Sequence, residues 1–231
     1  MFPGLKAIPA LNGAGSTGSG AGGALTFSFV ASATSEDSTI TIPASAIAGD
    51  FAILFDAAEG QGASISSVVP AGWTSIVDTF AASGSRSIRS LVSYRKLVAA
   101  GGGSITGMNA DGETKIMLVF RPSSSISSTV VSTWNAEMTS GDPASQTVSA
   151  SGVATPLIVF AFATKGETGT ALPAFTTETP AMTNVTKFGT AYDPEVRLGY
   201  TIYNSSPSNQ SIDIGDNGAM NGLQSGYVRF T

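Results

Sequence analysis

The sequence predicts an all-β protein, an antiparallel, jelly-roll-like β-sandwich built from two related halves and preceded by an extended, Gly-rich N-terminal arm. Three observations lead to this fold. Apolar and polar residues alternate along several short segments, apolar runs of strand length are bounded by Gly or Pro, and the second half of the chain repeats features of the first. Alternation and short apolar runs are typical of strands, and no segment keeps the longer period of a helix.

The expected strands follow one another at short intervals. Turn residues such as Gly101-Gly-Gly103 and Asn217-Gly218 separate them. Short strands at this spacing indicate an antiparallel sandwich. The alternating segments are 25–30, 39–42 and 211–214, the apolar runs are 51–55, 116–120 and 157–162, and a Tyr-bearing strand is expected at 91–97.

The internal repeat defines the expected domain organisation, because separate segments align at nearly the same offset. The aligned pairs are residues 50–60 with 156–166, 70–74 with 180–183, Tyr94 with Tyr203, and Val119 with Val228. We therefore expect an arm with a Gly/Ser linker over 1–24 and a sandwich over 25–231, with half-repeats 25–121 and 130–231.

Within this repeat, Trp73 and Met182 occupy equivalent positions after a Pro-initiated turn. Pro fixes the turn, and the large apolar side chain that follows it is expected to plug one end of the core. The alternative is a Trp exposed for sugar stacking. The Met counterpart and the apolar neighbours Val68, Val69 and Ile76 favour the core plug.

The arm carries apolar residues at short intervals before a tract of Gly, Ser and Ala. Ordering a Gly-rich segment has a high entropic cost, so an ordered arm must be held by something. We expect its apolar side chains to anchor the chain in a neighbouring subunit; a tail folded on its own domain is the alternative. The anchor residues are Phe2, Leu5, Ile8 and Leu11.

Composition excludes several classes of function. Charged residues form 12% of the chain and the net charge is −5, without the Lys/Arg stripe that nucleic-acid binding requires. The chain has no Cys and no His, which excludes disulfides and His-based catalysis. No apolar run reaches the ~18 residues of a membrane helix, and the N-terminus lacks the apolar core of a signal peptide.

The sequence contains only partial matches to nucleotide-binding, calcium-binding and catalytic motifs. Gly13-Ala-Gly-Ser-Thr-Gly18 fits G-x-G-x-x-G but lacks the flanking strand and helix. Asp213 and Asp216 resemble part of a calcium loop, although Gly215 stands where an oxygen ligand is needed. The carboxylate pairs Asp56/Glu59, Asp111/Glu113 and Asp193/Glu195 are expected at turns, where acids are solvated. We therefore expect no enzyme, no cofactor and no metal, with calcium left open.

Taken together, several segments resemble a β-sandwich module of tailed bacteriophages that occurs in minor structural, tail-fibre and tail-tip proteins. They are the T-I-P-A…A-G-D segment with its apolar run over 41–55, P-A-G-W-T at 70–74, the Tyr-bearing strand 91–97 and the apolar strand 116–121 ending in Phe-Arg. The resemblance covers about residues 38–231 and is weaker in the second half. It implies a virion structural role without a catalytic site.

The leading interpretation is therefore a phage virion protein, a tail-tip, fibre or head-fibre component that contacts the host surface. It would assemble in the host cytoplasm and be released by lysis. Expected partners are other virion proteins, copies of the chain, for example in a trimer, and a host surface glycan. The alternatives are a capsid decoration protein and a carbohydrate-binding module, for which the candidate surface aromatics are Trp134, Tyr192, Tyr200 and Tyr227.

Overall fold

The computed structural model describes most of the chain as strands and short connections, and the described part contains no helix. This confirms the all-β class and the antiparallel pairing. The described residues are 24–61, 68–83, 86–108, 113–126, 130–140, 145–165, 181–187, 195–213 and 220–230.

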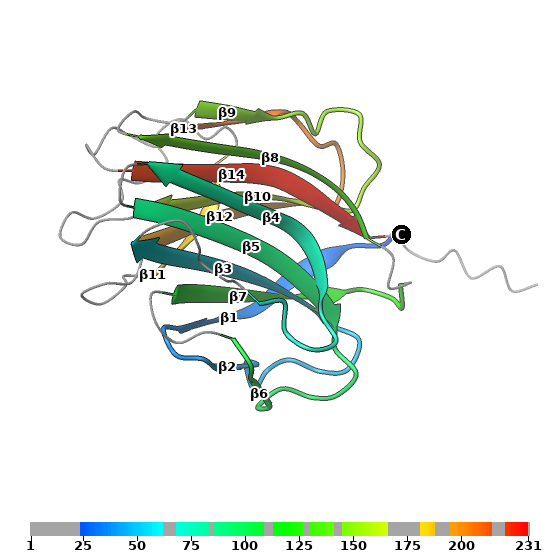
Figure 1. The fold of residues 1–231 in the computed structure, drawn as a ribbon. Coiled ribbons are helices and arrows are strands. Elements are labelled where there is room, and N and C mark those ends of the chain that lie inside the picture. The colour runs from blue at the N-terminus through cyan, green and yellow to red at the C-terminus, as the bar shows by residue number, and fades with distance from the viewer. Residues whose placement is uncertain are drawn as a thin grey trace, which may run out of the picture.

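Two five-stranded antiparallel sheets form the body of the molecule (Figure 1). The first sheet has the order β1-β7-β3-β5-β4 and the second the order β11-β12-β10-β14-β8. The strands of the first sheet are β1 (Phe27–Ser35), β3 (Phe51–Gln61), β4 (Thr74–Ser83), β5 (Arg86–Lys96) and β7 (Glu113–Pro122). Those of the second are β8 (Val130–Ser140), β10 (Leu157–Lys165), β11 (Thr183–Lys187), β12 (Glu195–Tyr203) and β14 (Met220–Phe230).

The two halves of the chain pair their strands in corresponding orders. If β1 corresponds to β8, β3 to β10, β4 to β11, β5 to β12 and β7 to β14, one sheet order becomes the other read backwards. Each sheet thus comes from one contiguous half of the chain. The jelly-roll connectivity, the finer part of the prediction, is not confirmed by this strand order.

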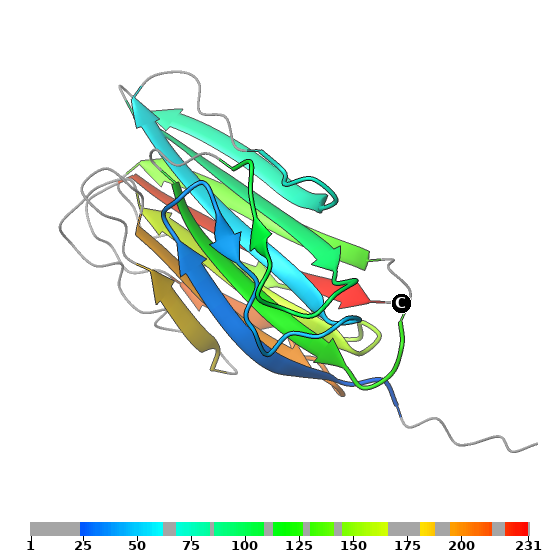
Figure 2. The same ribbon diagram turned by 90° about the horizontal axis from the view of Figure 1, so that it is seen from below.

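The main hydrophobic core lies between the two sheets, which form two layers (Figure 2). Phe55 of the first sheet meets Phe160 and Phe162 of the second, with ring centroids 5.3 Å apart in both pairs. Phe120 contacts the ring of Tyr200 across the same interface at 5.4 Å. Such tilted and edge-on contacts are the favoured geometries of aromatic pairs.

Each sheet also buries part of its outer face under a two-stranded ribbon. β2 (Ile40–Thr41) and β6 (Ser104–Ile105) cover the first sheet, and β9 (Ser145–Val148) and β13 (Gln210–Asp213) cover the second. Ile40 and Ile105 pack in one outer cluster, and Val148 and Ile212 pack in the other. Because β3 and β10 are therefore buried on both faces, their sequences are continuous apolar runs.

A close backbone approach fixes the connection that joins β5 to β6. The Gly101 N–H donates to the Ala46 carbonyl at 2.9 Å. A Cβ at Gly101 would lie 1.8 Å from the Pro43 carbonyl oxygen, whereas one at Gly103 would have no neighbour within 4 Å. Position 101 therefore requires glycine for space.

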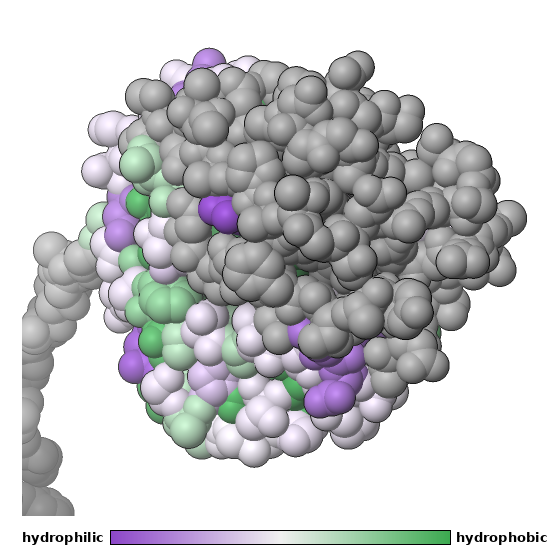
Figure 3. Space-filling model, turned by 90° about the vertical axis from the view of Figure 1, so that its left-hand side faces the viewer, coloured by the Kyte–Doolittle hydropathy of each residue, from purple (hydrophilic) through white to green (hydrophobic). Residues whose placement is uncertain are grey.

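The ends of the sandwich differ. At one end, the arm end, β1 begins at Phe27 opposite Pro122, and β3 begins at Phe51 opposite Lys96 (Figure 1). At the opposite end, the far end, lie Gln61 and Arg86, which pair with each other. Seen from the far end, the described surface is mostly of intermediate hydropathy, with few strongly hydrophilic residues (Figure 3).

Candidate functional site

The start of β1 is held to both sheets by hydrogen bonds. The Thr26 N–H donates to Ser123 Oγ at 3.0 Å, and the Ser123 N–H donates to the Thr26 carbonyl at 2.9 Å. The Phe27 N–H donates to Asn204 Oδ1 at 2.7 Å, and Asn204 Nδ2 donates to the Phe27 carbonyl at 3.1 Å. We call Thr26, Phe27, Ser123 and Asn204 the arm root.

The arm root connects elements that are distant in the sequence. Ser123 follows β7 of the first sheet, and Asn204 follows β12 of the second. Phe27 is buried in the main core, and Leu25 packs against the same core. A pull on the chain at residue 24 would therefore be transmitted to both sheets.

A charged hydrogen-bond network lies at the arm end. Arg121 Nε and Nη2 donate to Asp50 Oδ1 and Oδ2 at 2.9 and 2.8 Å, and Nη2 also donates to the Ser45 carbonyl at 3.0 Å. Burial alone would raise the pKa of Asp50, but hydrogen bonds from Arg121 and the Ile47 N–H, together with the Arg121 charge, lower it. The Asp50 carboxylate therefore fastens the loop before β3 to the end of β7.

Two open hollows adjoin this network and share Lys96. One, of about 480 Å³, is lined by Tyr94 and Arg95 among others, and the second, of about 220 Å³, is lined by Asp50 and Arg121 among others. Lys96 Nζ donates to the Ile126 carbonyl at 2.6 Å. The hollows present hydrogen-bond donors near the arm end, without a nucleophile and base held together among the residues named.

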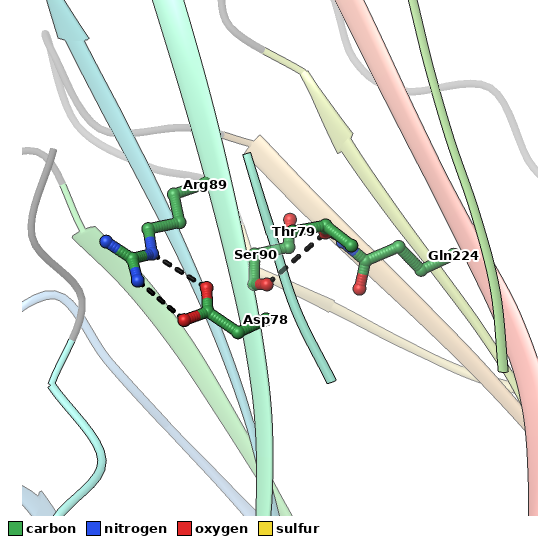
Figure 4. Close-up of polar contacts among 5 residues, drawn as sticks. All are labelled: Asp78, Thr79, Arg89, Ser90 and Gln224. Carbon is green, nitrogen blue, oxygen red and sulfur yellow. Dashed lines mark hydrogen bonds and ion pairs between the residues drawn. The ribbon is translucent and has the colours of Figure 1, made fainter. Parts of the chain in front are cut away.

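Polar contacts also join β4 to its neighbours (Figure 4). Gln224 of the second sheet donates to Thr79 of the first, and Thr79 Oγ1 donates to the Ser90 carbonyl at 3.4 Å. On the opposite face, Arg89 Nε and Nη2 reach Asp78 at 2.7 and 2.5 Å. The hydrogen bond to Asp78 raises the pKa of Arg89. Because this ion pair is partly exposed, we expect about 0–1 kcal/mol from it.

Sequence reasoning missed a cluster of buried charges on the outer face of the first sheet. Asp56, Glu113 and Lys115 are each at most 1% exposed. Lys115 Nζ lies 2.8 Å from Glu113 Oε2, and Lys115 stands directly opposite Asp56 in the pairing of β7 with β3. The placement of Asp56 and Glu113 at solvated turns is wrong. β3 continues past Asp56 to Gln61, and Glu113 is the buried first residue of β7. The sequence did contain a signal for this cluster, because Asp56 directly follows the apolar run 51–55 and Lys115 directly precedes the apolar run 116–120.

Trp73 and Met182 occupy corresponding places in the two halves. Trp73 is 7% exposed in the outer cluster under β2 and β6, and Met182 is 6% exposed in the outer cluster that includes β9 and β13. The Trp73 N–H donates to the Pro70 carbonyl at 3.0 Å, and Gly72 has a φ of 78°. This is the geometry that places glycine third in a type II turn.

The other predicted site residues are only partly described. Tyr200 is 5% exposed in the main core, so the interpretation of Tyr200 as a surface aromatic is wrong. Tyr227 is half-buried against the outer cluster of the second sheet, and Trp134 lies on β8 opposite Gly226. Asp213 is the last residue of β13. The residues outside the described part are Phe2, Leu5, Ile8, Leu11, Tyr192 and Asp216, together with Asp111 and Asp193 of the carboxylate pairs.

The described ranges offer neither a metal site nor a membrane-spanning helix. These residues contain no group of three or more Asp and Glu placed to hold a metal ion. Among the same residues, no helix has the length and apolar character to cross a membrane.

Comparisons with protein-family models, curated proteins and solved structures find no match to this chain.

Proposed function

We propose that the protein is a bacteriophage virion structural protein, a surface-exposed tail-tip, fibre or head-fibre component attached through residues 1–24. The arm root is the observation that carries this proposal. It joins the first residues after the arm to both sheets through Ser123 and Asn204. An appendage held by an N-terminal arm needs such a root, since force on the arm would otherwise peel off the edge strand β1.

The shape of the molecule also supports attachment at one end. The described chain begins just before β1, at the arm end, so the far end points away from the proposed attachment (Figure 1). We propose that the far end contacts the host surface. A many-copy particle would make weak contacts of this kind effective through avidity.

The finer architecture belongs to the same proposal. We infer a jelly-roll-like sandwich of two related halves, 25–121 and 130–231. The corresponding pairing orders of the two sheets support related halves. The matching positions of Trp73 and Met182 in the two outer clusters support them as well.

Deletion of residues 2–24 tests the attachment. The truncated protein should keep the strand content of the full chain by circular dichroism and be missing from particles assembled in its presence. A matched control replaces residues 12–24 with a Gly/Ser tract of equal length and should assemble normally. Full occupancy of the particle by the truncated protein would show that the arm is not the anchor.

A second variant separates the apolar anchors from the tract. Replacing Phe2, Leu5, Ile8 and Leu11 with Ser removes their apolar surface and leaves the length unchanged. We expect the same loss of incorporation as with the deletion. Normal incorporation would contradict anchoring by these four side chains.

A further inference from the structure

The cluster of Asp56, Glu113 and Lys115 places one amine and two carboxyl groups on one face of adjacent strands. Opposite residues of antiparallel strands have Cβ atoms about 5 Å apart, so the Asp56 carboxyl lies within the reach of the flexible Lys115 side chain. Glu113 precedes Lys115 by two positions, which puts both side chains on the same face. The Glu113 carboxylate already contacts Lys115 Nζ at 2.8 Å.

Most strand neighbours of this cluster are apolar, although Ser35 of β1 stands opposite Lys115. Leu91 stands opposite Asp56 on β5, and Ala58 and Met117 follow Asp56 and Lys115 on the same face; all three are at most 1% exposed. Burying charged groups in such a site has a high free-energy cost. A reaction that removes two of the charges is therefore favoured by the site itself.

We propose that Lys115 and Asp56 form an intramolecular amide bond, an isopeptide link between β7 and β3, with Glu113 as the catalytic proton carrier. The proposal does not depend on the proposed virion function. Two reactants held in place on rigid strands react as if at very high concentration. Exclusion of water also protects the product from hydrolysis.

The step balances without an oxidant or another reactant. In the proposed step a proton first passes from the Lys115 ammonium to the Asp56 carboxylate. The amine nitrogen then attacks Cγ of the Asp56 carboxyl, and the Nζ–Cγ bond forms. Glu113 takes a proton from Nζ and delivers it to the departing hydroxyl of Asp56. The Cγ–O bond breaks, one water molecule leaves, and Glu113 returns to its initial state.

The isopeptide bond would act as a covalent cross-link in a chain that has no cysteine and therefore no disulfide. It would close a loop between residues 56 and 115, which restricts the unfolded chain in the way a disulfide does. It would also join β3, the central strand of the first sheet, to its neighbour β7. The sheet would then resist separation of these strands under load.

Intact-mass spectrometry of the purified, denatured full chain tests the proposal. We expect a mass lower than that of the sequence by one water molecule. A protease digest should contain one branched peptide that joins the segments of Asp56 and Lys115. A wild-type mass equal to that of the sequence, without the branched peptide, would overturn the proposal.

Variants separate the reaction from a simple ion pair. Lys115→Arg and Glu113→Gln should both have the full mass of their sequences. Asp56→Asn should lose ammonia instead of water and reach the same final mass as linked wild type. Lys96→Arg is the matched control, because Lys96 bonds a carbonyl elsewhere, and it should still lose one water. A water loss that persists in Lys115→Arg would contradict the assignment.

Discussion

The packing of the two sheets can be tested by removing one ring from the main core. Phe160 is fully buried, with ring centroids 5.3 Å from Phe55 and 6.0 Å from Phe120. A buried Phe hides roughly 200 Å², which at about 25 cal/mol per Å² corresponds to ~5 kcal/mol. An alanine at position 160 keeps part of this burial free energy, but it leaves a cavity in the core. We expect Phe160→Ala to lower the free energy of unfolding by about 3–5 kcal/mol.

Urea denaturation followed by circular dichroism measures this change. The midpoint should fall while the slope stays constant, because the exposed surface of the unfolded chain is nearly unchanged. Phe80→Ala is the matched control, since Phe80 lies on the edge strand β4 and is 47% exposed. We expect less than about 1 kcal/mol for it. Equal losses for the two variants would refute the face-to-face packing of the sheets.

Three further predictions concern the stability of the fold. Gly101→Ala should destabilise by about 1–3 kcal/mol or more, because the new Cβ overlaps a backbone carbonyl, while Gly103→Ala should change little; equal effects would contradict the close approach. Asn204→Ala should cost about 1–3 kcal/mol and speed amide exchange at the start of β1, and unchanged exchange would contradict the arm root. The lowered pKa of Asp50 means that its ion pair stabilises the fold above its ordinary pKa of 3.8 and is lost as pH falls through the folded value. The difference in Tm between wild type and Asp50→Asn should therefore be present at neutral pH and shrink as the pH falls below 3.8, and a difference that stays constant into acid would contradict this assignment.

The central strands could be predicted from the sequence because burial on both faces gives them continuous apolar runs. β3, β7 and β10 are buried on both faces over much of their length and read as apolar runs, and the strands expected at 51–55, 116–120 and 157–162 lie within them. β4 is an edge strand that mixes polar and apolar residues and has a register shift between Ser75 and Val77. Its pattern therefore gives no clear strand signal.

The arm root and the buried charges could not be predicted, because both depend on pairing between distant segments. Asn204 reaches Phe27 only when the two sheets face each other. Asp56 is buried because β7 brings Lys115 beside it, whereas its local sequence contains the acids and glycines of a turn. Tyr200 was misassigned for a related reason, since alternation shows that it shares a face with Leu198 but not which face is covered.

Gold labelling of purified particles with an antibody to this protein is the decisive test of the virion proposal. We expect label on intact virions; label at the tail end would support a tip or fibre, and sparse label on projections from the head would support a head fibre. Dense label across the whole head would instead show a capsid decoration protein. Particles without label would contradict the virion proposal.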